Sequence, residues 1–320
     1  MTQRPDEVAR ALTDRIEAAI HRDVGRGMNP VFGATQGGLF GAAAALVAFG
    51  APRIGLITGF FVPNADPPAA ETDGPAGAAL MARAFVHAGL SCRLATDTTC
   101  RSACRAALDA AGAIAVPIDA AAPDQPIEAL IDLWRSSAID WVIAIERCGP
   151  AADGNSRNMR GTDISAHAAP LHRLFGAGPW RSIAIGDGGN EIGMGRVAPV
   201  LIAQHVPLGE AIGCVVPADF LITAGVSHWG AYAMLAALAV LRPEWSGAML
   251  ASVAEHLDQA VVEAMVRDGP AVDGVSLRHE ATIDALDFAV HHAVLRRILA
   301  VIGEPPAADI VASNRMSGRQ

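Results

Sequence analysis

The sequence predicts an α/β fold, a mostly parallel sheet flanked by helices in a three-layer, Rossmann-like arrangement, with a helical C-terminal part. Three observations predict it. Short, unbroken apolar runs of strand length recur along the chain, longer Ala-rich stretches of helical length separate them, and the region after Ala224 carries helical patterns only. Unbroken apolar strands joined by helices are typical of parallel sheets that are buried on both faces.

The expected elements follow in chain order. After an amphipathic, charged helix within residues 1–24, six apolar runs are the expected strands: residues 54–58, 92–95, 113–118, 141–145, 183–185 and 214–216. Helices are expected between them at residues 75–88, 99–111, 127–136 and 164–175. The C-terminal part, 225–303, should hold helices at 229–241, 247–267 and 282–302, followed by a loose tail at 304–320. Because no repeat or linker is evident, residues 1–320 are expected to form one domain.

The composition excludes several classes of protein. With 320 residues, 52% of them hydrophobic and 18% charged, the chain can bury a sizeable core, which excludes a disordered protein. All 24 basic residues are arginine, and lysine is absent. A pyridoxal-phosphate Schiff base and the ordinary P-loop both need a lysine, so we expect neither PLP nor a bound nucleotide.

Charge and hydropathy restrict the partners and the location. A net charge of −9 argues against a nucleic-acid partner. No apolar stretch reaches the ~20 residues that span a bilayer, and the N-terminus lacks the apolar core of a signal peptide, so we expect a cytoplasmic protein without a membrane partner. The five scattered cysteines argue against a disulfide framework. The Ala-rich helices after Ala224 could bury a homo-oligomer interface or close the core, and both alternatives stay open.

Polar segments follow four of the expected strands. They occupy residues 59–75, 146–165, 186–195 and 217–230, and they are rich in Asp, Glu, Asn, Arg and Gly. In open parallel sheets, ligands bind at the carboxyl ends of the strands. The sequence therefore predicts a small-molecule site at this edge.

The segment 186–195, GDGGNEIGMG, carries the densest signal. Asp187, Asn190 and Glu191 are candidate catalytic residues, and Asp187 and Glu191 are candidate ligands of a divalent metal, Mg²⁺ or Mn²⁺. Gly188 and Gly189 could offer backbone N–H groups to an oxyanion. The alternative is a glycine turn in which Asn and Glu cap a helix.

The segment 146–165 combines acids with arginines. Arg147 and Arg160 are candidates for binding a substrate carboxylate, because guanidinium groups bind carboxylates bidentately. Asp153 is a candidate general base, and Asn158 and Asp163 are candidate substrate contacts. A solvated, charged loop is the alternative.

Three shorter segments complete the candidates. Glu71, Thr72 and Asp73 precede a proline that marks a helix start. Asp73 is either a plain N-cap, or this segment faces the ligand and Glu71, Thr72 and Asp73 are candidate substrate contacts. Arg26, which could also bind a carboxylate, and the pair Ser227 and His228 are candidate wall elements of the site.

Taken together, these segments resemble the C-terminal domain of D-glutamate cyclase, in its stand-alone bacterial form. The resemblance is carried by GRGMN (25–29), GFFVPNADPPAAETDGP (59–75), AADGN and NMRGTDIS (151–165), GDGGNEIGMG (186–195), VVPADFLITAGVSHWG (215–230) and VDG (272–274). It implies a hydro-lyase that cyclises D-glutamate, a small acidic amino acid, to 5-oxo-D-proline with loss of water.

The chain departs from the family pattern near the expected site. The departures are Cys148, Pro150, Ser156 and Arg157, together with His228, which stands where the family usually has asparagine. The substrate could therefore be a related amino acid. Two functions of other classes stay open as well. A Mg²⁺-dependent enzyme that uses a nucleotide or phosphate would place phosphate on the glycine loop, and a non-catalytic module that binds an acidic amino acid would need the arginines alone.

Overall fold

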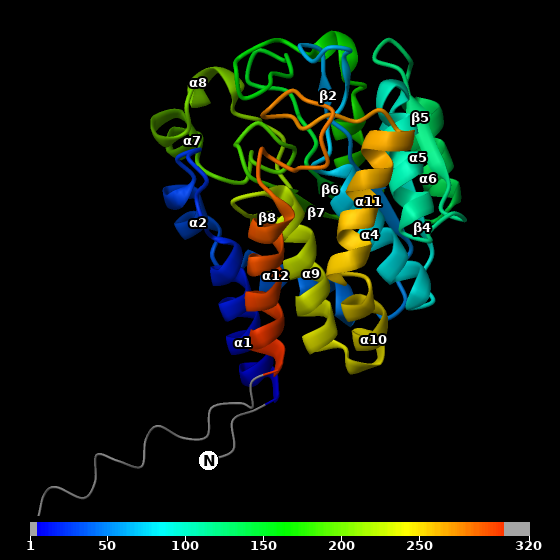
Figure 1. Ribbon diagram of the computed structural model, residues 1–320, viewed down its shortest axis with the longest axis vertical. Coiled ribbons are helices and arrows are strands. Elements are labelled where there is room, and N and C mark those ends of the chain that lie inside the picture. The colour runs from blue at the N-terminus through cyan, green and yellow to red at the C-terminus, as the bar shows by residue number, and fades with distance from the viewer. Residues whose placement is uncertain (1–4, 304–320) are drawn as a thin grey trace, which may run out of the picture.

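The computed structural model describes residues 5–303 and contains a six-stranded parallel sheet. The strand order is β5-β4-β1-β6-β7-β8, which is the 3-2-1-4-5-6 order of doubly wound folds when only these strands are numbered (Figure 1). The predicted α/β class with a parallel sheet between helical layers is confirmed. The strands are β1 (Ile54–Ile57), β4 (Cys92–Asp97), β5 (Ile118–Ala121), β6 (Trp141–Ile145), β7 (Arg181–Gly186) and β8 (Phe220–Thr223).

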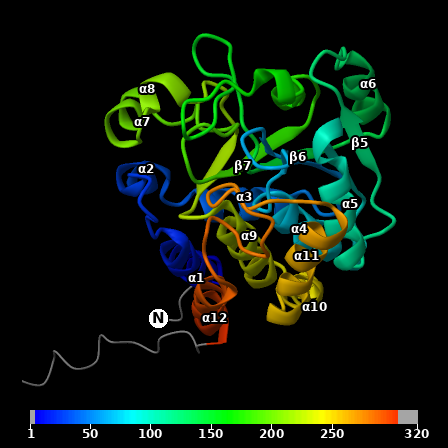
Figure 2. The same cartoon turned by 45° about the horizontal axis from the view of Figure 1, so that its top comes forward.

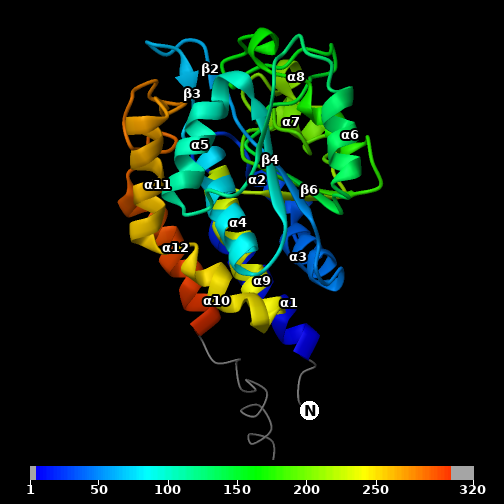
Figure 3. The ribbon, with the colours of Figure 1, turned by 90° about the vertical axis from the view of Figure 1, so that its right-hand side faces the viewer.

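Alternation along each strand sends side chains into two apolar cores. In β6, Trp141, Ile143 and Ile145 enter one core, whereas Val142 and Ala144 enter the other. The first core is covered by α1 (Pro5–Ile20), α3 (Gly38–Ala48), α4 (Pro75–His87), α5 (Arg101–Ala110), α9 (Ser227–Leu241), α10 (Pro243–Ala251), α11 (Glu255–Asp268) and α12 (Phe288–Gly303). The second is covered by α2 (Asn29–Thr35), α6 (Glu128–Ser136), α7 (Pro199–His205) and α8 (Gly209–Ile212); Figure 3 shows α11 and α12 on one side of the strands and α6 on the other.

Two expected strands are displaced. The last strand is β8 at 220–223 instead of 214–216, because the backbone of 214–216 bonds to loops beyond the sheet: Cys214 donates to the Gly189 carbonyl and Val215 to the Pro150 carbonyl, each at 3.0 Å. Likewise, β5 begins at Ile118, where the prediction for 113–118 ended. Apolar runs alone do not tell whether a run enters the sheet or lies above it.

Three expected helices also differ. Residues 164–175 form two short 3₁₀ turns, Ser165–His167 and Leu171–Phe175, because Pro170 interrupts a continuous helix. The stretch 247–267 is split between α10 and α11. The expected helix 282–302 begins only at Phe288, after a loop in which Asp284 and Ala285 have positive φ values of 56°. The tail expected at 304–320 lies outside the described residues, and the single domain stays a prediction.

Residues 29–48 contain α2 and α3, which the sequence analysis did not predict. By length and composition alone this 20-residue stretch is apolar enough to cross a membrane, which corrects the expectation that no stretch of this length is present. The two helices are separated at Gln36 and Gly37, where Gly37 has a φ of 86°. The carboxylate of Glu17 accepts hydrogen bonds from the backbone N–H groups of Gly37 and Leu39 and thereby holds the start of α3.

The carboxyl ends of the strands carry the long loops. A small antiparallel ribbon, β2 (Phe61–Val62) and β3 (Ala69–Ala70), follows β1. Figure 2, in which this end of the molecule comes forward, shows the segment between α11 and α12 beside the loops that follow β6 and β7. Hydrogen bonds from the Arg160 guanidinium to the carbonyls of Gly274 and Val275, at 3.2 and 2.8 Å, join these segments.

His291 should make the fold sensitive to acid. Its Nδ1 accepts a hydrogen bond from the Trp229 indole at 2.8 Å, and Nε2 lies 3.2 Å from the carbonyls of Ile283 and Leu286, so the neutral ring ties the 283–286 loop to α9. Burial, with the nearby His228 charge, lowers the pKa of His291 to about 4. His291 therefore binds a proton more tightly in the unfolded chain than in the folded protein. Its contribution to the free energy of unfolding is complete above pH ~6.5 and decreases as the pH falls toward 4, by about 3 kcal/mol at most.

We expect the free energy of unfolding, measured by urea titration between pH 7.5 and 4.5, to fall more steeply in the wild type than in His291→Gln. Other titrating groups are common to both proteins. Parallel pH profiles would contradict this role of His291.

Candidate active site

A cavity of about 280 Å³ opens at the carboxyl ends of β1, β6 and β7. Strand order reverses between β1 and β6, and doubly wound folds bind their ligands at this switch point. Its charged and amide lining comes from Arg26, Glu71, Glu146, Asn158, Arg160, Asp187, Asn190 and Asp284. Its apolar lining includes Phe60, Phe61, Val62, Met159, Pro207 and Val275.

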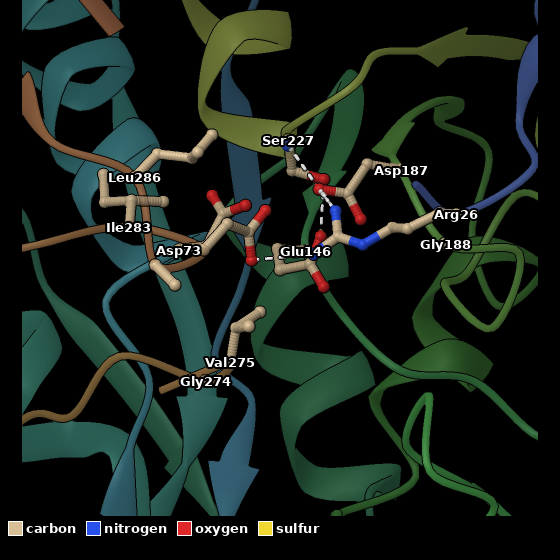
Figure 4. A network of polar contacts seen from close by, with 12 residues as sticks. Arg26, Asp73, Glu146, Asp187, Gly188, Ser227, Gly274, Val275, Ile283 and Leu286 are labelled. Atoms are coloured by element: carbon tan, nitrogen blue, oxygen red, sulfur yellow. Dashed lines mark hydrogen bonds and ion pairs between the residues drawn. The ribbon is translucent and has the colours of Figure 1, made fainter. Parts of the chain in front are cut away.

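Three buried carboxylates form the centre of the site. Asp73, Glu146 and Asp187 each offer an oxygen within 4.8 Å of the others (Figure 4). Asp73 precedes α4, Glu146 follows β6 and Asp187 follows β7, so three separate strand-to-helix connections bring the acids together. Hard oxygen donors at this spacing suit a divalent cation such as Mg²⁺ or Mn²⁺.

The backbone around Glu146 is held in an uncommon conformation. Glu146 has a φ of 42°, a region that costs energy for residues other than glycine. The loop before α4 approaches closely, because a Cβ on Gly74 would lie 2.8 Å from the Glu146 Cβ. Ser227, the first residue of α9, donates its hydroxyl to Glu146 and its backbone N–H to Asp187 at 2.8 Å. The side chain of Glu146 is thus held by the Ser227 hydroxyl and by the close approach of Gly74.

Arg26 places a guanidinium group among these acids. It forms ion pairs with Asp187 and Asp284, each at 2.7 Å. Its loop is held by Asp23, whose carboxylate accepts hydrogen bonds from the backbone N–H groups of Arg26 and Gly27. Burial alone lowers the pKa of Arg26, but the two carboxylates outweigh it and raise this pKa well above the usual range. Arg26 therefore carries a permanent charge.

Burial and mutual repulsion favour the protonated forms of the acids. Burial is the main cause that raises the pKa values of Glu71, Glu146 and Asp187 well above their usual range, and neighbouring carboxylates add to it. The pKa of Asp73 is raised to about 7, again mainly by burial, while His228 acts in the opposite direction. Asp73 Oδ2 and Asp284 Oδ2 are buried without a hydrogen-bond partner, as expected of atoms that face a ligand.

Glu191 has a structural role, which corrects its assignment as a catalytic and metal-binding residue. Its two carboxylate oxygens accept hydrogen bonds from the backbone N–H groups of Asp187, Gly188 and Gly189, at 2.9, 2.6 and 2.8 Å. The N–H groups of Gly188 and Gly189 are therefore used within the loop and do not form an oxyanion hole. Glu191 instead fixes the turn that aims Asp187 into the cavity.

Three further candidates lie away from the cavity. Arg147 is buried in an ion pair with Asp97 and also donates to the Gly59 and Ala169 carbonyls, so it joins loops instead of binding substrate. Asp153 is exposed and pairs with Arg157 at 2.6 Å. Asp163 is exposed as well, and it accepts a hydrogen bond from the Ser165 N–H.

The remaining candidates surround the cavity or hold its wall. Glu71, Asn158, Arg160 and Asn190 line it. Asn158 Oδ1 accepts hydrogen bonds from the backbone of Arg160 and Thr162, and Asn190 donates to the Arg157 carbonyl. Thr72 is buried and donates to the Thr282 carbonyl at 2.7 Å, so it supports the loop that carries Asp284.

His228 belongs to a buried network next to the site. Its Nε2 lies 2.6 Å from Asp258, which also binds Tyr232 and His292, while its Nδ1 has no hydrogen-bond partner. Burial alone lowers the pKa of His228, but Asp258 outweighs it and raises this pKa. None of the residues that depart from the family pattern, Cys148, Pro150, Ser156, Arg157 and His228, lines the cavity.

Two acids of the site were not assigned an individual role from the sequence. Glu146 directly follows the apolar run 141–145, and this position at a strand end was a signal that could have singled it out. Asp284 carried no such signal, because it was expected inside a helix. Phe60, Phe61 and Val62 line the cavity and were not assigned either.

A doubly wound sheet with polar groups converging at its switch point is the arrangement at which α/β proteins of this class bind small molecules. The family described as D-glutamate cyclase-like, C-terminal, matches residues 16–299, and the chain belongs to this family. The resemblance seen in the sequence is confirmed.

Human mitochondrial D-glutamate cyclase is similar to this chain over part of its length. The two are 43% identical over 111 residues, which is 33% of this chain. The match spans 18% of the length of the human protein.

Variants of Glu191 and Asp153 test the structural role of Glu191, with the exposed Asp153 as the matched comparison. We expect Glu191→Gln to lower the free energy of unfolding by about 2–3 kcal/mol, because an amide cannot accept three N–H groups as the carboxylate does. Asp153→Asn, in an exposed ion pair, should change neither stability nor turnover measurably. Urea titration measures both. Equal stabilities of the two variants would contradict the structural role of Glu191.

Proposed function

We propose that the protein cyclises D-glutamate to 5-oxo-D-proline with loss of water. The observation that carries the proposal is the buried trio Asp73, Glu146 and Asp187 at the switch point of the sheet. Family membership and the similarity to human D-glutamate cyclase support the substrate and its configuration. The cavity of about 280 Å³ is near the small end of ligand pockets, which suits an amino acid.

The proton balance of the reaction explains why several acids are needed. The substrate amine attacks its own γ-carboxyl carbon, a C–N bond forms, and a C–O bond breaks. The ammonium nitrogen gives up two protons, and both end on the oxygen that leaves as water. A site that carries this transfer needs one group that accepts a proton while another donates one. Neighbouring carboxyls with raised pKa values meet this need.

We assign substrate binding and proton transfer to different residues according to their positions in the cavity. Arg160 at the cavity wall binds the α-carboxylate, because its hydrogen-bond partners in the structure are the neutral carbonyls of Gly274 and Val275. Glu146 takes the proton of the ammonium, and Asp73 or Asp187 protonates the leaving oxygen. Intramolecular attack makes positioning the main contribution, since oriented intramolecular reactions reach effective molarities of roughly 10⁵–10⁸ M.

A divalent cation, Mg²⁺ or Mn²⁺, is the second use that we propose for these acids. Ionised Asp73, Glu146 and Asp187 would hold it, with Asp73 in place of the Glu191 expected from the sequence, and an acid that holds the ion does not donate a proton at the same time. The buried Asp73 Oδ2 without a partner supports this fit. When bound, such an ion would polarise a carboxyl oxygen of the substrate.

Neutralising Glu146 should abolish most of the activity. We expect Glu146→Gln to lower kcat for D-glutamate by roughly 10²–10⁴-fold, because the amide cannot accept the proton. The measurement is an NMR time course of 5-oxoproline formation from D- and L-glutamate. Asp153→Asn is the control. A folded Glu146→Gln protein with near-normal turnover would refute the assignment.

Metal binding can be measured without turnover. We expect isothermal titration calorimetry to show Mn²⁺ binding to the wild type, and at least tenfold weaker binding to Asp187→Asn, because one hard anionic ligand is lost. Glu263→Gln, on the outer face of α11, is the control. Unchanged Mn²⁺ affinity in Asp187→Asn would remove the cation from the proposal.

The other functions and the cellular location have less support. A nucleotide or phosphate would meet several carboxylates in the cavity, and the glycine-loop N–H groups that could bind phosphate are taken by Glu191. A module that only binds an acidic amino acid would not need three buried acids. A cytoplasmic location is proposed from the sequence, whereas the human relative is named as mitochondrial.

A further inference from the structure

Asp284 is an acid of the cavity that has no role in the proposed reaction. It lines the cavity, and its side chain is only 8% exposed. Its Oδ1 forms the ion pair of 2.7 Å with Arg26, whereas its Oδ2 is buried and has no hydrogen-bond partner within residues 5–303. Buried polar atoms of native proteins are nearly always hydrogen-bonded. The unpartnered Oδ2 therefore indicates that a ligand supplies the missing donor.

The loop between α11 and α12 holds Asp284 at the cavity. Asp284 has a φ of 56°, which is uncommon for a residue other than glycine. The fully buried Asp273 maintains this conformation, because its Oδ2 accepts hydrogen bonds from the Thr282 hydroxyl and from the Ala285 N–H, each at 2.7 Å. These two bonds hold the chain on both sides of Asp284. An uncommon backbone conformation that the surrounding structure maintains is typical of functional positions.

The chemistry of Asp284 restricts the group that it can bind. A carboxylate accepts hydrogen bonds and donates none, so its missing partner is a donor, and a cationic donor binds it best. A metal ion is the alternative, but the three carboxylates that lie within 4.8 Å of one another are Asp73, Glu146 and Asp187, without Asp284. The proposed substrate has one cationic donor, its α-ammonium group. Glu71 suits this group less, because burial, together with neighbouring carboxylates, raises its pKa well above the usual range.

Resting on the proposed cyclisation, we propose that Asp284 binds the α-ammonium group of the substrate and makes the site selective for ligands with a free amino group. Arg26 pairs with both Asp284 and Asp187, so a group bound to Asp284 lies next to the acids assigned to proton transfer. Arg160, which binds the α-carboxylate in the proposed reaction, donates to two carbonyls of the same loop. One loop thus positions two of the substituents of the α-carbon.

This assignment defines the ligand class as acidic amino acids whose amino group is unmodified. Glutarate has the carbon chain and both carboxylates of D-glutamate, and it lacks only the ammonium group. Contacts of the carboxylates with Arg160 or with a metal ion are available to both ligands. Because specificity is a difference of two affinities, the comparison of these ligands isolates the contribution of Asp284.

The test measures the binding of both ligands by isothermal titration calorimetry. The whole chain is used in a Glu146→Gln background, in which turnover is expected to be slow. Asp284→Asn removes the charge, and asparagine tolerates a positive φ as aspartate does. We expect it to weaken D-glutamate binding by roughly tenfold or more, since a hydrogen bond between charged groups is lost, and to change glutarate binding by less than about twofold. Asp287→Asn, at an exposed position of the same loop, is the matched control and should change neither affinity.

Two kinds of result would overturn the inference. Equal losses for both ligands would show that Asp284 acts through Arg26 or through the fold, and unchanged binding of D-glutamate, or none to the background protein, would show that Asp284 does not bind the ammonium. Mn²⁺ binding that is lost in Asp284→Asn would assign this carboxylate to a metal ion instead. If Asp284→Asn does not fold, the background protein decides, because glutarate binding as tight as that of D-glutamate would overturn the inference.

The proposed function fails or stands by a separate measurement. An NMR time course in which the wild type forms no 5-oxoproline from D-glutamate would refute the cyclisation, and the comparison of the two ligands would still decide whether Asp284 binds the ammonium. Turnover by the wild type, together with equal losses of both ligands in Asp284→Asn, would leave the cyclisation intact and overturn this inference alone.

Discussion

The burial of several carboxylates at one edge of a parallel sheet is the constraint on which the site depends. Removing an ionised carboxylate from water costs several kcal/mol unless a partner compensates. Arg26 supplies the compensating charge, and Ser227 supplies an O–H and an N–H. These partners come from the segment before α2 and from the start of α9, so distant parts of the chain must meet here. The loop before α12 joins them because Asp284 also pairs with Arg26.

Two pairs of acids differ in how completely their oxygens are bonded. Glu191 accepts three backbone N–H groups, and Asp97 accepts the Arg147 guanidinium together with the Ala169 N–H. Such acids need no ligand. Asp73 and Asp284 each keep one buried oxygen without a partner. This difference distinguishes Asp73 and Asp284 from the two acids that build loops, and it cannot be read from residue type or spacing.

The fold was more predictable from the sequence than the site. Apolar runs located β1, β6 and β7 because strands buried on both faces are apolar throughout, and they located β4 although Arg93 interrupts its run. The same rule failed at 214–216, where an apolar run bonds to loops above the sheet. At the candidate site, strand ends indicated the segment that holds Asp187, and the structure places Asp187 in the cavity lining. Spacing alone then misassigned Glu191, since a carboxylate four residues away can turn inward to its own loop as easily as toward a ligand.

The position of His228 shows how a residue behind the wall can act on the cavity. Asp258 holds the imidazole at 2.6 Å and favours its charged form. That charge opposes the effect of burial on Asp73, whose pKa is raised to about 7, while those of Glu146 and Asp187 are raised well above their usual range. Acids whose pKa values are pushed apart can divide donor and acceptor roles. An uncharged side chain in place of His228 would leave the pKa of Asp73 closer to the pKa values of Glu146 and Asp187 and weaken that division.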